Sequence, residues 1–147
     1  MTEQTLACPT FKHYVEIQIR FSDIDMQGHA SNTVYQTYYD YGKLDYIDTV
    51  FGKMQWEELA LVGASVKIDF LKPIFLKTLI AVKTRVSHIG NKSITVEHCI
   101  VDRTNGEIMS TCTAVLVCYA PKLNQSVPVP EQWRKNIIEY EERPDLS

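Results

Sequence analysis

The chain has 147 residues, of which 45% are hydrophobic and 22% charged, and its formal net charge is −3. This length and composition predict a single domain over residues 1–147 that buries a core without disulfides or a metal ion. The negative charge argues against nucleic acid or an anionic membrane as a partner. The short polar N-terminus has no signal-peptide pattern, and no apolar run approaches the ~20 residues that span a bilayer. We therefore expect a cytoplasmic protein without membrane contact.

The first predicted element is a strand. Apolar and polar residues alternate from Lys12 to Phe21, which is typical of a half-buried strand. Its buried face would carry Val15, Ile17, Ile19 and Phe21.

The second predicted element is a long helix with Ser31 as its N-cap, running from Asn32 to about Thr49. Apolar and aromatic residues recur at helical spacing along one broad stripe: Tyr35, Tyr38, Tyr39, Gly42, Tyr46 and Ile47. A glycine weakens a helix by ~1 kcal/mol relative to alanine. We expect this glycine to allow close approach of the helix to a covering sheet.

The rest of the chain is mainly strands. After an irregular stretch at 51–61 with a short helical turn, four strands are predicted at residues 62–72, 79–89, 92–101 and 107–119. Residues 121–130 form a loop, and a short surface helix follows at about 131–142. One long helix beside antiparallel strands predicts an α+β architecture, with the sheet wrapped around the helix.

The cysteines and histidines do not suggest a metal centre. The cysteines have no metal-ligand spacing and no Cys-x-x-Cys pair, and the histidines do not cluster with carboxylates or cysteines. These residues are Cys8, Cys99, Cys112, Cys118, His13, His88 and His98. Cys112 and Cys118 lie on one face of a predicted strand and are expected to be small core residues. We predict no metal site and no disulfide framework, which indicates a reducing compartment.

The loop between the first strand and the long helix contains the candidate catalytic residues. Residues 21–32 contain two acids, a glycine, a histidine and an asparagine, directly before the helix N-terminus. A carboxylate there can attack a carbonyl, or activate water against it, while backbone N–H groups stabilise the carbonyl oxygen. This arrangement suits thioester hydrolysis.

The same loop also carries a family resemblance. The segment Asp23-Ile24-Asp25-Met26-Gln27-Gly28-His29-Ala30-Ser31-Asn32-Thr33-Val34-Tyr35 resembles the Asp-x-Asp-x-x-Gly-His-Val-Asn-Asn-x-x-Tyr signature of hotdog-fold acyl-CoA thioesterases. These enzymes form the 4-hydroxybenzoyl-CoA thioesterase-like group. Asp40 and Lys43 fall where that family often has Glu and Arg, and the likeness continues through residues 68–74, 89–93 and 128–131.

The resemblance implies a hotdog fold, in which an antiparallel β-sheet wraps around one long central α-helix. It also implies self-association to a dimer or tetramer, with active sites where subunits meet. The implied substrate is an acyl-CoA, or an acyl group on a carrier protein, and no cofactor is implied.

Three residues are assigned to catalysis through the resemblance. Asp25 matches the catalytic carboxylate, which acts as nucleophile or as general base. The main-chain N–H of Asn32 matches the donor to the thioester oxygen. His29 and the Asn32 side chain would position substrate or water. Asp23 is expected to hold the loop or to pair with Arg20.

The substrate-binding residues are assigned in the same way. Gly28 would let the backbone pass close to the acyl group, and Tyr35 would line an acyl pocket. The predicted contacts to coenzyme A are Asn91, Lys92 and Ser93, at a hairpin.

Two alternatives remain. A hotdog hydratase or dehydratase is disfavoured, because its motif places an aspartate five residues before a histidine, whereas Asp25 precedes His29 by four. A non-catalytic acyl-CoA-binding protein stays open, because Ala30-Ser31 replaces the family's Val-Asn.

Overall fold

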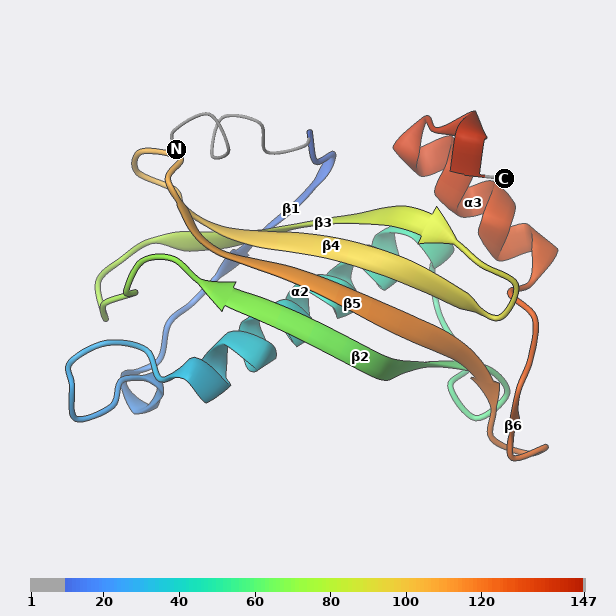
Figure 1. The fold of residues 1–147 in the computed structure, drawn as a ribbon, viewed down its shortest axis with the longest axis horizontal. Coiled ribbons are helices and arrows are strands. Elements are labelled where there is room, and N and C mark those ends of the chain that lie inside the picture. The colour runs from blue at the N-terminus through green and yellow to red at the C-terminus, as the bar shows by residue number, and fades with distance from the viewer. Residues whose placement is uncertain (1–9, 147) are drawn as a thin grey trace.

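The computed structural model describes residues 10–146 (Figure 1). Six antiparallel strands form one sheet in the order β1-β3-β4-β5-β2, and the short β6 pairs with β5. The elements are β1 (His13–Ile17), η1 (Phe21–Asp23), α2 (Asn32–Phe51), β2 (Ala60–Phe70), β3 (Ile80–Ile89), β4 (Ser93–Asp102), β5 (Ile108–Ala120), β6 (Gln125–Ser126), α3 (Glu131–Glu141) and η2 (Pro144–Leu146).

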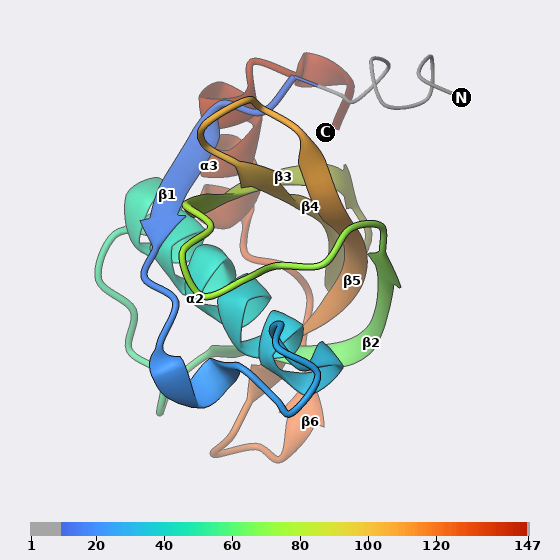
Figure 2. The same cartoon turned by 90° about the vertical axis from the view of Figure 1, so that its left-hand side faces the viewer.

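The sheet curves around α2, as the end-on view shows (Figure 2). Gly42 lies where helix and sheet meet. A Cβ atom at this position would lie 2.5 Å from Cγ1 of Val82 on β3 and 3.3 Å from the Thr84 hydroxyl oxygen. The expected reason for a glycine in this helix is therefore confirmed: any side chain here would force α2 away from the sheet.

The core between helix and sheet has two apolar clusters. One surrounds the first half of α2 with Tyr35, Tyr38 and Tyr39, and the other surrounds its second half with Tyr46 and Ile47. Between them lies a row of three buried polar residues on neighbouring strands. In the sheet register, His13 of β1 lies opposite Thr84 of β3, and Thr84 lies opposite His98 of β4.

Strand β2 forms one edge of the sheet and differs from the other long strands. It pairs with β5 on one side, and within residues 10–146 no strand lies on its other side. Its apolar residues Val62, Val66 and Phe70 are each nearly half exposed. Such an edge offers unpaired backbone groups and apolar side chains to another strand.

Most predicted elements are confirmed, with two differences. The first strand ends at Ile17, and Phe21 begins the 3-10 helix η1, where its side chain is 83% exposed instead of buried. The loop predicted at 121–130 contains the short strand β6. None of the helices over residues 10–146 combines the length and apolarity that a membrane crossing requires.

Candidate active site

The loop before α2 is anchored by a buried aspartate. Asp23 is 2% exposed, and its carboxylate accepts hydrogen bonds from the Arg20 amide at 2.9 Å and the Tyr38 hydroxyl at 2.9 Å. The Arg20 guanidinium lies 2.9 Å from its other oxygen. Burial alone would raise the pKa of Asp23, but these hydrogen bonds hold it below its usual value. The expected role of Asp23, pairing with Arg20 to hold the loop, is confirmed.

The loop itself is closed by its own backbone. The Asp25 amide donates to the His29 carbonyl, and the Gly28 amide donates back to the Asp25 carbonyl. Gly28 has a φ of +89°, which a residue with a side chain adopts only with strain. This tight turn sets Asp25 opposite His29, next to an isolated β-bridge between Ile24 and Ala30.

The start of α2 keeps free amide donors. Ser31 is the N-cap, as predicted, but its hydroxyl bonds to the Thr33 hydroxyl at 3.0 Å and not to a helix amide. Within residues 10–146, no hydrogen bond uses the main-chain N–H of Asn32 or Thr33 as donor. Because the first amides of a helix also carry the positive end of its dipole, they form a ready site for a developing oxyanion.

A pocket of about 310 Å³ lies directly beside these amides. Three predicted site residues line it: His29, Asn32 and Tyr35. The opposite wall comes from the end of β2 and the residues after it, Phe70 and 71–73. The rings of Tyr35 and Phe70 meet edge to face at 4.8 Å, and this contact joins the helix to the strand. We call this cavity the helix-start pocket.

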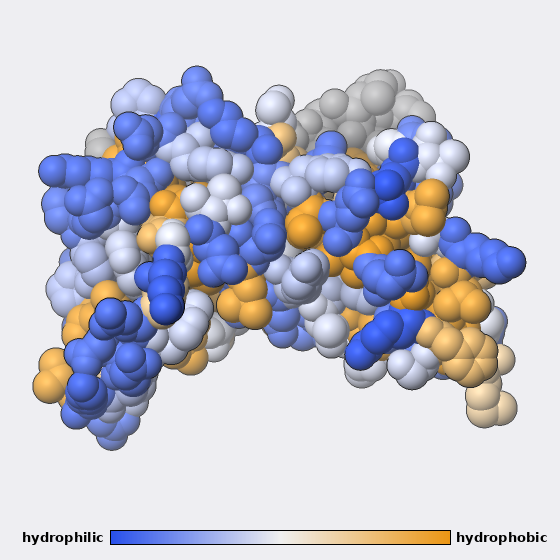
Figure 3. Space-filling view, turned by 180° about the vertical axis from the view of Figure 1, so that it is seen from behind, coloured by the Kyte–Doolittle hydropathy of each residue, from blue (hydrophilic) through white to orange (hydrophobic). Residues whose placement is uncertain are grey.

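Apolar side chains are exposed around this end of the molecule. They come from the active-site loop and from the segment after β2: Phe21, Met26, Leu71, Phe75, Leu76 and Leu79. From behind, apolar patches interrupt the hydrophilic surface on the half of the molecule that carries the loop (Figure 3). Clustered exposed apolar groups often mark a binding surface.

The other predicted site residues lie outside the helix-start pocket. Asp25 sits on the same loop with an exposed side chain, and its Oδ1 accepts the Gln27 amide at 2.8 Å. Asn91, Lys92 and Ser93 lie at the β3–β4 turn, at the opposite end of the molecule (Figure 1). One chain therefore brings together the loop and helix residues, but not the predicted coenzyme A contacts.

Comparison with known proteins decides the family. Residues 19–137 match the family described as the thioesterase-like superfamily. The chain belongs to the thioesterase-like superfamily. The predicted enzyme class, a thioester hydrolase, is confirmed at this level, and so is the hotdog fold.

Three proteins that resemble this superfamily member share less than 30% sequence identity with it. A thioesterase from Thermus thermophilus, solved with coenzyme A and zinc, shares 28% identity with a TM-score of 0.79, covering 91% of this chain and 97% of its own. A 1,4-dihydroxy-2-naphthoyl-CoA thioesterase from Synechocystis has a TM-score of 0.78 at 16% identity, covering 88% and 97%. The Arabidopsis thaliana acyl-acyl carrier protein thioesterase ATL3 is 24% identical over 133 residues, which are 87% of this chain and 68% of the relative.

This thioesterase-like chain also has buried histidines whose partners the sequence did not reveal. His13, which shows no cluster with carboxylates or cysteines in the sequence, has its Nε2 atom 2.8 Å from a carboxylate oxygen of Asp45 on α2. His98 packs its ring against Tyr39 at 5.2 Å. The alternation Val96, His98, Ile100 could have placed His98 on the inward face of its strand. Within residues 10–146, no group of three or more potential ligands from His, Cys, Asp and Glu could hold a metal ion.

Proposed function

We propose that this chain hydrolyses acyl-CoA thioesters at the start of α2, releasing a free carboxylic acid and the coenzyme A thiol. One observation carries the proposal. In a member of the thioesterase-like superfamily, three motif residues, His29, Asn32 and Tyr35, line one pocket beside the free amides of the helix. The Thermus relative was solved in complex with coenzyme A, which supports an acyl-CoA as substrate.

The chemistry follows from this arrangement. The thioester oxygen rests on the first-turn amides of α2, including that of Asn32, where the charge of a tetrahedral intermediate is stabilised. Asp25 supplies the carboxylate, as nucleophile toward the carbonyl carbon or as general base toward water. The Gln27 amide occupies only Oδ1 of Asp25. Either route consumes one water molecule and breaks the carbon–sulfur bond, so the proposed reaction uses no cofactor.

A second copy of the chain would complete the site. The β2 edge is the surface for this copy, paired antiparallel along its unpaired side. The sheet register aligns Ser93 with Val117 and Val117 with Val62, so the β3–β4 turn lies level with the start of β2. Antiparallel pairing of two β2 strands would set the turn of one copy near the loop of the other. Asn91, Lys92 and Ser93 then reach coenzyme A from the second copy.

The test is a thiol-release assay on short, long and aromatic acyl-CoAs and on acyl carrier protein thioesters. Asp25→Ala should lower turnover at least ~100-fold without changing the oligomeric mass, because catalytic carboxylates contribute effects of this size. Asp48→Ala removes an exposed acid near the other end of α2 and should leave turnover unchanged. Equal rates in the wild type and Asp25→Ala would remove Asp25 from the mechanism.

The same assay separates the alternatives. With crotonyl-CoA, loss of enoyl absorbance without thiol release would identify a hydratase. Binding of acyl-CoA without either change would identify a non-catalytic binding protein. Thiol release that depends on Asp25 supports the thioesterase.

A further inference from the structure

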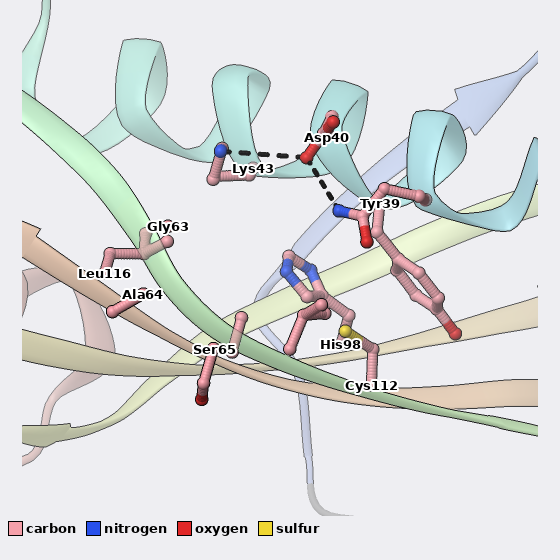
Figure 4. Close-up of a pocket in the computed structure, with 12 residues that line it drawn as sticks. Tyr39, Asp40, Lys43, Gly63, Ala64, Ser65, His98, Cys112 and Leu116 are labelled. Atoms are coloured by element: carbon pink, nitrogen blue, oxygen red, sulfur yellow. Dashed lines mark hydrogen bonds and ion pairs between the residues drawn. The ribbon is translucent and has the colours of Figure 1, made fainter. Parts of the chain in front are cut away.

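A second cavity lies between α2 and β2, one to three turns beyond the helix-start pocket (Figure 4). Its volume is about 290 Å³. Residues 36–43 of α2 form one wall, residues 63–66 of β2 form the other, and His98 and Cys112 lie beneath the helix. We call it the α2–β2 cavity. Like the helix-start pocket, it is lined by residues of both α2 and β2.

His98 is the unusual member of this lining. Its side chain is only 4% exposed, and Nδ1 lies 2.9 Å from the Thr84 hydroxyl. Within residues 10–146, its other ring nitrogen, Nε2, makes no hydrogen bond and is not fully enclosed, so it is accessible from the cavity that His98 lines. A ring nitrogen at the wall of a cavity can hydrogen-bond a polar group that enters that cavity. A ligand in the cavity is therefore a natural partner for Nε2.

The Thr84 contact fixes which nitrogen carries the proton. Thr84 is fully buried, and His98 is the one hydrogen-bond partner of its hydroxyl among the described residues. A buried hydroxyl needs an acceptor for its hydrogen, and only Nδ1 is available. The hydroxyl thus donates to Nδ1, and the ring proton lies on Nε2. His98 thereby offers the cavity one N–H donor.

This donor carries no charge. Burial, helped by the positive charges of Lys43 and His13, lowers the pKa of His98 to about 3. Burial raises the pKa of the neighbouring Cys112 thiol to about 12. The nearest charges at the rim are already matched: Asp40 accepts a hydrogen bond from Gln36 at 3.1 Å and lies 3.7 Å from the Lys43 ammonium. The deep part of the cavity therefore suits a neutral acceptor and not a carboxylate.

We propose that the α2–β2 cavity receives the distal part of the acyl chain, and that His98 selects acyl groups with a hydroxyl or keto oxygen there. Tyr39, against which the His98 ring packs, lies two turns after Asn32, ~10 Å along the helix axis. The selected oxygen is thus remote from the thioester, near the far end of a medium-length chain. This role of His98 as a specificity-determining residue rests on the proposed thioesterase function.

A plain aliphatic chain in the cavity leaves Nε2–H without an acceptor. Sites built to hydrogen-bond a substrate group reject analogues that lack it more strongly than apolar pockets reject an extra group. The oxygenated substrate should therefore have a kcat/KM at least ~10-fold above its aliphatic counterpart.

The experiment compares ω-hydroxyoctanoyl-CoA and ω-hydroxydecanoyl-CoA with octanoyl-CoA and decanoyl-CoA by thiol release. The wild type should prefer one or both hydroxylated substrates at least ~10-fold in kcat/KM. His98→Leu should abolish this preference, because it removes the donor. His98→Gln, which keeps an N–H donor, should retain part of it, and Asp25→Asn should slow all substrates alike.

The outcomes separate the two proposals. If the wild type releases thiol equally from hydroxylated and plain chains, or if His98→Leu keeps the preference, His98 has no selective role. If no thioester is hydrolysed, the proposed function itself is overturned. If His98→Leu fails to fold, the test rests on two measurements: the preference of the wild type for hydroxylated substrates, and the reduction of that preference in His98→Gln.

Discussion

Strands β4 and β2 have similar lengths and both alternate apolar and polar residues, yet β4 is mostly buried and β2 is exposed along most of its length. β4 lies between β3 and β5, and even its outward residues Cys99 and Val101 are covered, with Phe11 packed nearby. β2 has a neighbour on one side. Alternation thus predicts which face of a strand points inward, but the neighbouring strands decide whether that face is buried.

The two strands also have different roles around the α2–β2 cavity. β4 holds His98 below the helix, with its ring packed against Tyr39 and its Nδ1 bonded to the Thr84 hydroxyl. β2 forms a wall of the α2–β2 cavity while its other edge remains open. A fixed inner group and an outer wall that the proposed second copy would complete together suit a site that must be selective and still admit substrate.

The largest expected effect concerns the buried histidine of β4. The pKa of His98 is lowered to about 3 in the folded chain, against ~6.5 when unfolded, so protonation favours the unfolded state. The free energy of unfolding should fall by up to ~1.4 kcal/mol per pH unit as the pH drops from about 6.5 toward 3. Above pH ~6.5 His98 is neutral in both the folded and the unfolded chain, so its protonation no longer lowers the free energy of unfolding.

Denaturant unfolding at a series of pH values measures this slope. His98→Gln has no titrating group at this position and should lose that part of the slope. Carboxylates such as Asp23 contribute equally in both proteins, so the difference between the two curves isolates His98. Parallel curves would show that the buried imidazole does not resist protonation.

A smaller effect separates the apolar residues of the two strands. Ile100 on β4 is fully buried, and Ile100→Ala should cost ~2–5 kcal/mol through lost burial and a cavity. Val66 on β2 is 49% exposed, and Val66→Ala should change the stability of the single chain by less than ~0.5 kcal/mol. Urea midpoints at low protein concentration measure both, and similar losses would mean that the β2 edge is covered within one chain.

Much of the fold was predictable because it depends on local patterns. The helix from Asn32, the strand positions after it and the close approach at Gly42 follow from periodicity and residue size. Phe21 was placed wrongly because alternation alone does not register that the Arg20 amide and side chain bind Asp23, which ends the strand and starts a 3-10 turn. Local hydrogen bonds between residues three apart overrode the pattern there.

The site was predictable only where it is continuous in sequence. His29, Asn32 and Tyr35 belong to one segment and meet in one pocket. His98 joins its surroundings through pairing across strands, which alternation does not reveal. The roles of Asp25 and of residues 91–93 remain predictions, because they concern substrate and a second copy of the chain.

The last prediction tests the open edge of β2 directly. Val66→Lys places a charge on the edge strand, which opposes pairing with a second copy. The wild type should sediment as a dimer or larger assembly and Val66→Lys as a folded monomer with at least ~10-fold lower thiol release, because each site would lose the groups of its partner.

Thr113→Lys is the matched control: it adds the same charge at an exposed position on β5, a strand with neighbours on both sides, and should keep mass and activity. Since Val66 also borders the α2–β2 cavity, the sedimented mass decides the outcome and not the rate. A wild-type monomer with full activity would mean that one chain suffices, and that β2 is exposed for a reason other than self-association.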